Sequence, residues 1–261
     1  VGIGVIGSYL PSLTIPMLGE TGTLWLAIIW VACGGILAYF SLRKVPVDRS
    51  RVNLPMRDKM TEMARAVTIL FTNQNVFYAC LIRIINTLSL FGFAIIMPLL
   101  FVDRLGFTIS EWLQIWAVFF FVTIFTNIFW GLTGEKLGWI RQVRWFGCLG
   151  MAISSLTFYY LPLYAGHNFW VALIPAVMLG IFVAAFVPMT AVFPTLEPHH
   201  KGAAVSIYNL SAGLSNFVAP AIASVMLPFF DIVGVVWAYT GLYVFAGVLT
   251  FIIRVPQPGH T

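Results

Sequence analysis

Charged residues are scarce in this sequence. Only 9% of its 261 residues are Asp, Glu, Lys or Arg, whereas 60% are hydrophobic and the mean hydropathy is +0.95. A water-soluble domain of this length could not bury so much apolar surface in one core, because most of its exterior would then be apolar. The scarcity of charge therefore excludes a soluble enzyme or soluble binding domain and indicates a protein that spans a lipid bilayer.

Cysteines are also few. Cys33, Cys80 and Cys148 all lie within apolar segments, and none belongs to a CxxC pair. Their odd number and their spacing indicate neither a disulfide framework nor a zinc site, and no metal or cofactor is expected. The basic residues form no aromatic–basic module, so nucleic acid is not an expected partner.

Long apolar runs fill most of the chain. Each complete run approaches or exceeds the ~20 residues that cross a bilayer as a helix, so we expect an all-α, polytopic membrane protein. A shorter, glycine-rich run over 1–18 comes first. The seven predicted complete spans are 23–42, 76–102, 112–133, 144–164, 169–194, 203–229 and 235–253.

The basic residues alternate between the two sides of these spans. One side carries twelve of the fourteen, Arg104 lies on the other side, and Arg83 lies inside a span. Because positively charged loops stay in the cytoplasm, this pattern predicts a multi-pass protein of the inner (plasma) membrane with a cytoplasmic C-terminus. The twelve are Arg43, Lys44, Arg49, Arg51, Arg57, Lys59, Arg65, Lys136, Arg141, Arg144, Lys201 and Arg254.

Two distant segments share the same spacing of glycine, proline and Met-Leu. GVIGSYLPSLTIPML begins at Gly4, and GLSNFVAPAIASVML begins 209 residues later, at Gly213. Trp25 and Trp237 then follow at an offset of 212. A parallel repeat of six-helix units is one plan of membrane transporters, with the substrate held near mid-membrane between the halves. The chain, which begins without Met, is therefore interpreted as helices 5–12 of a twelve-helix protein.

On this plan the chain has three parts. Residues 1–42 are the last two helices of an N-terminal bundle, 43–75 are a cytoplasmic linker with a short amphipathic helix, and 76–261 are a C-terminal six-helix bundle. Glycines and prolines of the repeat are expected to permit close helix packing and bending while the two bundles rock. They are Gly4, Pro11, Gly213 and Pro220.

The loop GLTGEKLGWIRQVR resembles the cytoplasmic loop motif of the major facilitator superfamily. In that family an acid caps the facing helix and pairs with basic residues, which latches the cytoplasmic side in the outward-open state. Glu135 stands at the acid position, whereas Trp139 and Ile140 replace the usual first basic pair. The positions that match are Gly131, Glu135, Lys136, Gly138, Arg141 and Arg144.

Four further segments extend the resemblance over essentially the whole chain. They are RIINTLSLFGFAIIMP, EWLQIWAVFFF, RWFGCLGMAISSLTFYYLP and AAFVPMTAVFPTLEPHHKGAAVSIYNLSAGLSNF. Together they are similar to bacterial pentitol permeases of the same superfamily. The resemblance implies proton-coupled uptake of a sugar alcohol, ribitol or D-arabinitol, by rocker-switch alternating access.

A sugar alcohol offers only hydroxyl groups, so its site should present amides, hydroxyls and aromatic faces. Three spans supply such side chains near mid-depth. Hydrogen bonding between helices is the alternative explanation, because it also favours Asn, Ser and Thr in membranes. The candidates are Asn86 and Ser89, the helical stripe Trp116, Phe120, Thr123 and Asn127, and the pair Asn209 and Asn216.

Arg83 lies about two turns into its span, where charges are costly and often functional. Its side chain either extends to the cytoplasmic interface or is buried with a partner, which would be an acid on the missing helices or an anionic substrate. An organic-anion/proton symporter of the same superfamily is therefore the main alternative. No acidic residue lies at that depth, so we expect the proton site on the missing helices.

An integral-membrane enzyme is the alternative from another class. Its best evidence is the cluster of Glu197, His199 and His200. Adjacent histidines point in different directions on a helix, and neither HExxH nor a carboxylate pair accompanies them. A solvated turn explains the cluster, so no catalytic residue is assigned and an enzyme is not expected.

Overall fold

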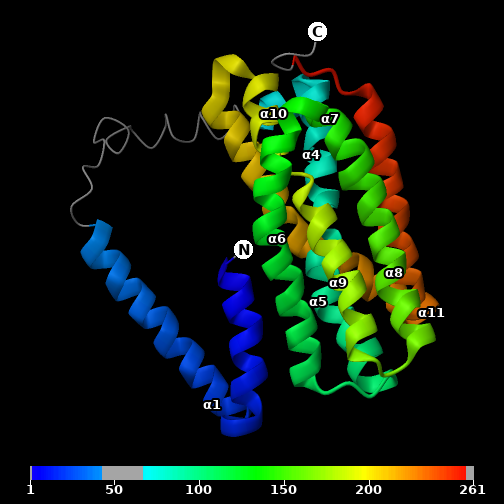
Figure 1. Cartoon of the computed structure of the whole chain (residues 1–261). Helices are drawn as coiled ribbons and strands as arrows, with labels where there is room; N and C mark the ends of the chain where they lie inside the picture. Colours follow the sequence, from blue (N-terminus) through cyan, green and yellow to red (C-terminus); the bar gives the residue numbers. More distant parts are fainter. Residues whose placement is uncertain (1, 43–66, 257–261) are drawn as a thin grey trace.

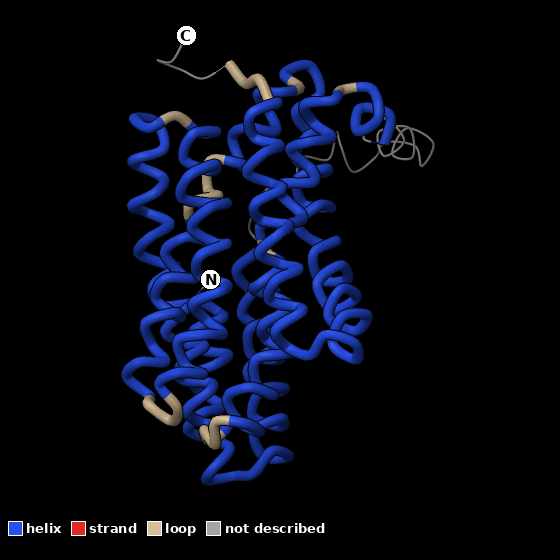
Figure 2. Tube along the Cα trace, turned by 90° about the vertical axis from the view of Figure 1, so that its right-hand side faces the viewer, coloured by secondary structure: helices blue, strands red, loops and turns tan. Residues whose placement is uncertain are grey.

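The computed structural model describes residues 2–42 and 67–256. These residues form long helices joined by short connections at the two ends of a bundle, and the described part contains no strand (Figures 1 and 2). The predicted all-α fold is therefore confirmed. The amphipathic helix predicted within the 43–75 linker lies mostly outside the described residues.

Two of the longest helices are hairpins of two arms. Helix α1 (Gly2–Leu42) departs from helical geometry at Gly19, with φ 70° and ψ 176°, and α11 (Lys201–Ile252) departs at Asp231, with φ 58° and ψ −172°. Figure 1 shows the two arms of α1 meeting at such a turn. Positions 19 and 231 are 212 residues apart, which is the offset between Trp25 and Trp237 in the predicted repeat. The repeat thus reappears as nearly the same backbone conformation at two equivalent positions.

The helices between these hairpins correspond to the predicted spans. Three of the membrane-length segments consist of two or more consecutive helical elements, because a break or a π-helical turn interrupts each of them. The elements in chain order are α4 (Gln74–Asn86), α5 (Leu88–Pro98), η1 (Leu99–Arg104), α6 (Ile109–Leu137), α7 (Trp139–Gln142), η2 (Val143–Leu149), α8 (Gly150–Ala165), α9 (Phe169–Ala184), α10 (Met189–Leu196) and η3 (Pro198–His200).

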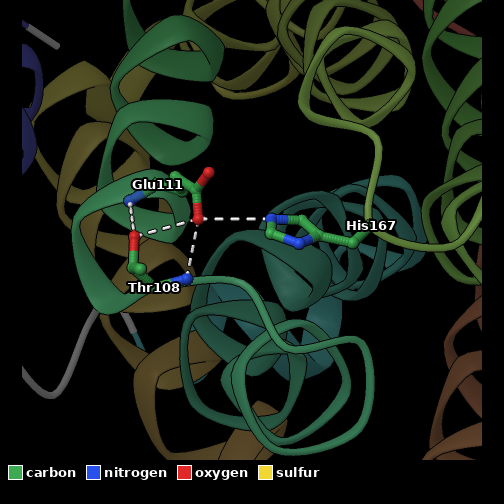
Figure 3. A network of polar contacts seen from close by, with 3 residues as sticks. All are labelled: Thr108, Glu111 and His167. Carbon is green, nitrogen blue, oxygen red and sulfur yellow. Dashed lines mark hydrogen bonds and ion pairs between the residues drawn. The ribbon is translucent and has the colours of Figure 1, made fainter.

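The start of α6 has a complete capping box. The Thr108 hydroxyl accepts a hydrogen bond from the Glu111 backbone N–H at 3.2 Å, and the Glu111 carboxylate accepts one from the Thr108 backbone N–H at 2.8 Å. The same carboxylate lies 3.4 Å from His167 Nε2 in the α8–α9 connection (Figure 3). The cap therefore fixes where α6 begins and also places two neighbouring connections side by side at this end of the bundle.

An aromatic cluster fills the core between α5, η1, α6 and α8. Trp112 stacks on Trp116 with ring centroids 5.3 Å apart, and the Phe158 ring of α8 lies 5.5 Å from the Phe93 ring of α5. The Phe101 ring of η1 lies 5.1 Å from that of Trp112. Such rings contribute large buried apolar areas, so this cluster holds one side of the bundle together.

Helices α6 and α9 are joined by polar side chains whose partners are all backbone carbonyls. The Thr126 hydroxyl lies 3.1 Å from the Gly180 carbonyl oxygen, and Trp130 Nε1 donates to the Ile181 carbonyl oxygen at 2.8 Å. A Cβ atom on Gly180 would lie 2.7 Å from the Phe119 carbonyl oxygen. Only glycine therefore permits this approach. We refer to Thr123, Thr126, Trp130 and Gly180 as the α6–α9 contact.

Candidate functional site

The crossing formed by α4 and α5 is interrupted near its middle. Helix α4 ends at Asn86, α5 begins at Leu88, and Thr87 between them has φ −104° and ψ 14°. Neither proline nor glycine occupies the break, so no conventional helix-breaking residue marks it. Interrupted helices near mid-membrane are where many transporters hold their substrates, because the interruption frees polar backbone groups inside the membrane.

Tyr243 of α11 satisfies the backbone groups that the break frees. Its hydroxyl accepts a hydrogen bond from the Ser89 N–H at 3.1 Å and donates one to the Asn86 carbonyl oxygen at 3.1 Å. The side chain is fully buried. Unpaired backbone groups are costly inside a membrane, so this tyrosine makes the break stable. Ser89 is further held by Ser155, whose hydroxyl oxygen is 2.9 Å from its own.

Three side chains at the break have enclosed polar atoms without a partner among the described residues. These atoms are Oδ1 of Asn86, Oγ1 of Thr87, and Nε and Nη1 of Arg83. The residues are spaced i, i+3 and i+4, so they share one face of the helix. Buried polar groups are nearly always hydrogen-bonded, and an exception needs an explanation such as a ligand. We refer to Arg83, Asn86 and Thr87 as the break site.

Arg83 is half-buried and packs against α11. Its guanidinium carbon lies 4.7 Å from the centroid of the Tyr208 ring on α11, and two of its nitrogens are enclosed by protein. A cation over an aromatic face is stabilised by the ring's electrons. The choice between the two positions that the sequence left open stays a prediction.

The other predicted binding residues lie in different surroundings. Thr123 donates to the Phe119 carbonyl oxygen at 2.7 Å as part of the α6–α9 contact, and Trp116 belongs to the aromatic core. Asn127 is half-buried, whereas Asn209 and Asn216 are exposed. The structure does not bring these residues together with the break site.

The first arm of α11 turns its serines towards α4. The Ser211 hydroxyl donates to Cys80 Sγ at 3.0 Å, and the Ser215 hydroxyl donates to the Ile84 carbonyl oxygen at 2.7 Å. On the helix, Asn209 and Asn216 lie on the side away from these serines. They therefore face outward from the described bundle.

The residues of the repeat differ in their surroundings. A Cβ on Gly4 would lie 2.6 Å from the Phe120 ring, so this glycine allows the first arm of α1 to pack closely on α6. Gly213 has nothing within 4 Å of such an atom. Pro11 and Pro220 lie within their helices, and the non-helical residues are Gly19 and Asp231 instead.

The loop motif GLTGEKLGWIRQVR surrounds the junction of α6 and α7. Gly138 ends α6 with φ 88°, a conformation that glycine adopts without strain, whereas Gly131, Lys136 and Arg141 are exposed. Glu135 is exposed too. Arg144 is bound to α11, because its Nε donates to Thr250 Oγ1 at 2.8 Å and its Nη2 to the Thr250 carbonyl oxygen at 2.9 Å.

Several residues of the site were not predicted from the sequence. Thr87 and Tyr208 contribute to the break site or its surroundings, and Tyr243 holds the break. Gln142, which is fully buried beside the motif, donates from Nε2 to the Ala185 carbonyl oxygen at 3.0 Å. The signal that could have found them was a hydroxyl or amide within an apolar span, where every such group needs a partner.

Comparison with known proteins places these features in a family. Residues 79–261 match the model of the Major Facilitator Superfamily. The chain is 64% identical over all 261 residues to a ribitol transporter and to a D-arabinitol transporter of Klebsiella pneumoniae, and it covers 61% of each. It is 41% identical over 256 residues to an alpha-ketoglutarate permease of Bacillus subtilis, with 98% of the chain and 58% of that relative covered.

The chain thus spans about three fifths of the length of the relatives it matches. The family match covers well over half of the chain, and the membrane-length helices are those that the sequence predicted. The resemblance inferred from the loop motif and the helix segments is confirmed. The chain belongs to the Major Facilitator Superfamily.

Proposed function

We propose that this chain is the larger part of a secondary transporter that takes up a sugar alcohol, ribitol or D-arabinitol. The observation that carries the proposal is 64% identity, over the whole chain, to transporters named for these two compounds. An interrupted membrane helix with enclosed, unpartnered polar atoms among the described residues supports it, because such a place suits a small polar substrate.

The break site would bind the hydroxyl groups of the substrate. Asn86 Oδ1 is an acceptor that a substrate hydroxyl can donate to, and the Thr87 hydroxyl can both donate and accept. Asn86 is 6% exposed, so a helix movement that opens the break is needed before substrate reaches it. Alternating access supplies such a movement, since the two bundles rock about a site at mid-membrane.

Arg83 has a supporting role in this proposal. The guanidinium packs on Tyr208 and keeps α4 against the first arm of α11, which leaves the uncharged amide and hydroxyl to contact a polyol. Ser89 supports the same region through its contacts with Tyr243 and Ser155. Thr123 and Trp116 join helices elsewhere in the bundle. Phe120, Asn127, Asn209 and Asn216 remain candidates for contacts that other helices complete.

The second candidate function is organic-anion/proton symport. The observation that favours it is Arg83, whose enclosed Nε and Nη1 have no hydrogen-bond partner among the described residues. A substrate carboxylate could accept hydrogen bonds from both nitrogens. The 41% identity to an alpha-ketoglutarate permease is consistent with it. In this case Arg83 contacts the substrate directly, and Asn86 serves to orient it.

The described helices and the linker would have the places in the transporter that the sequence predicts. The arms of α1 would be the last two helices of the N-terminal bundle, residues 43–75 the linker, and 76–261 the C-terminal bundle. The end of the bundle with α7 would face the cytoplasm, where Glu135, Lys136, Arg141 and neighbouring residues form the gate. Proton coupling would use a carboxylate on helices that precede this chain.

Uptake by cells that express the full-length protein separates these functions. Labelled ribitol, D-arabinitol and α-ketoglutarate would be offered with and without an uncoupler, to wild type, Asn86→Ala and Arg83→Gln. We expect pentitol uptake that collapses with the uncoupler, falls about tenfold or more in Asn86→Ala and persists in Arg83→Gln. Uptake of α-ketoglutarate alone, abolished by Arg83→Gln, would establish the anion carrier instead.

A further inference from the structure

A shallow apolar groove of about 150 Å³ runs along the outside of the bundle, between η2 and the second arm of α11. None of the break-site residues lines the groove, although Tyr243, which holds the break, forms part of its floor. Its lining residues include Arg144, Trp145, Cys148, Val244, Gly247 and Phe251.

The floor of the groove is closed, and its edges are open. Cys148 and Tyr243 are buried, whereas Trp145 and Phe251 are 52% and 63% exposed. A Cβ at Gly247 would meet only Cys148 Cβ, at 3.5 Å. A side chain at position 247 would therefore project into the groove without a clash and fill part of it.

Arg144 is the charged residue among those that line the groove, and its guanidinium is held in place. Thr250, which is fully buried, accepts from Nε at 2.8 Å and from Nη2 at 2.9 Å, and the guanidinium carbon lies 3.6 Å from the centroid of the Phe251 ring. Both threonine oxygens are neutral acceptors, so these bonds orient the guanidinium without neutralising it. The π-helical turn of η2 carries Arg144 and Trp145, and such turns often occur at functional sites.

We propose that the groove binds an anionic phospholipid, with an acyl chain along the groove and the phosphate at Arg144. The apolar floor suits a hydrocarbon chain, and the oriented guanidinium suits a phosphate, which it recognises in a planar geometry. Trp145 stands beside Arg144 at the edge, a position that tryptophan favours at the membrane interface. Basic pockets between membrane helices bind anionic headgroups on the cytoplasmic side, which is the side proposed for this end of the bundle.

The same geometry gives Arg144 a role other than the cytoplasmic gate. Arg141, three residues earlier, is exposed and does not line the groove. The two arginines of one loop motif are thus predicted to differ, Arg144 binding lipid and Arg141 remaining available to the gate. This difference supplies a matched control, because both substitutions remove one positive charge from the same end of the bundle.

Native mass spectrometry and thermal unfolding of the full-length protein in detergent test the proposal. The probes are phosphatidylglycerol and phosphatidylcholine with identical acyl chains. We expect phosphatidylglycerol to remain bound and to raise the melting temperature more than phosphatidylcholine. Arg144→Gln should weaken phosphatidylglycerol binding about fivefold, and Arg141→Gln should leave the preference intact. Gly247→Leu should displace both lipids and keeps Arg144 in place, so it tests the groove if Arg144→Gln folds poorly.

Equal retention of the two lipids by wild type, or an unchanged preference in Arg144→Gln, would overturn the proposal. So would a Gly247→Leu protein that binds both lipids as wild type does. A stable dimer that Gly247→Leu disrupts, with no lipid retained, would assign the groove to a second copy of the protein instead. None of these outcomes depends on which substrate is transported, because the inference rests on the membrane-spanning fold and on the orientation proposed above for this end of the bundle.

Discussion

The break site and the α6–α9 contact contain similar side chains in similar apolar helices, yet they differ in whether those side chains have partners. In the α6–α9 contact, the hydroxyls of Thr123 and Thr126 and the Trp130 N–H all reach backbone carbonyls. At the break site, buried atoms of Arg83, Asn86 and Thr87 reach none among the described residues. The polar groups of the α6–α9 contact are satisfied by the fold, and we propose that those of the break site are satisfied by a ligand.

This difference has an energetic consequence. An unsatisfied buried polar group destabilises the folded state, and replacing it by an apolar group of the same shape can be neutral or stabilising. Removing a satisfied group instead loses a bond. Substitutions of Asn86 or Thr87 should therefore impair function and spare stability, and substitutions in the α6–α9 contact should do the reverse.

The strongest effect should come from Asn86. Asn86→Leu should lower pentitol uptake by the full-length protein about tenfold or more, because the acceptor at the break is lost. The melting temperature should stay level or rise, since the unpartnered Oδ1 is removed. Uptake assays and thermal unfolding of one preparation check both. An Asn86→Leu protein that melts well below wild type would mean that Asn86 is a structural residue.

Next in size is the effect of crowding the α6–α9 contact. Gly180→Ala would place a Cβ 2.7 Å from the Phe119 carbonyl oxygen, and the helices must separate to make room. Overpacking of this kind costs about 3 kcal/mol at the upper end of the usual range. Denaturation in mixed micelles measures it. The matched control is Gly241→Ala, where nothing lies within 4 Å, and equal stability of the two variants would contradict the prediction.

Tyr243→Phe should affect both stability and uptake, because the Tyr243 hydroxyl holds the break between α4 and α5 through two hydrogen bonds. The Ser89 N–H and the Asn86 carbonyl would lose their partner, which should lower the free energy of unfolding by about 2 kcal/mol. We expect lower stability and a raised KM for pentitol uptake. Tyr164→Phe, at an 84% exposed position, should change neither. A Tyr243→Phe protein with unchanged stability and KM would show that the hydroxyl does not hold the break.

Thr126 should show the weakest effect of the four positions. Thr126→Val removes the hydroxyl that donates to the Gly180 carbonyl oxygen. The free energy of unfolding should fall by about 0.6 kcal/mol, the average for such bonds in membranes, and KM should not change. Thr133→Val on the same helix loses only a bond to its own helix, to the Phe129 carbonyl, and should cost less. The same denaturation assay compares them. A changed KM for Thr126→Val would contradict a purely structural role for the α6–α9 contact.

Much of the fold could be predicted from the sequence because the bilayer imposes it. Run lengths indicated the crossings, and the repeat predicted equivalent hairpins, which the turns at Gly19 and Asp231 provide. The break at Thr87 could not be predicted, since it is held by a tyrosine hydroxyl that lies 157 residues beyond Asn86 in the chain. Local propensity carries no information about such a contact.

The candidate site was predicted only in part. Asn86 was identified as a polar residue at mid-depth, and so was Thr123, yet only the structure separates the free oxygen of one from the bonded hydroxyl of the other. The outward-facing Asn209 and Asn216 were indistinguishable from buried residues in the sequence, because both faces of that helix are equally apolar. Residue type shows that a polar group is present, and its partners depend on tertiary packing.

Equilibrium binding of labelled ribitol and D-arabinitol to the purified full-length protein would show whether substrate binds at the break. Wild type, Asn86→Leu and Thr126→Val would be compared by scintillation proximity in the same detergent. We predict saturable pentitol binding that Asn86→Leu weakens about tenfold or more and Thr126→Val leaves unchanged. Binding that survives Asn86→Leu at full strength would contradict the assignment of the break as the substrate site.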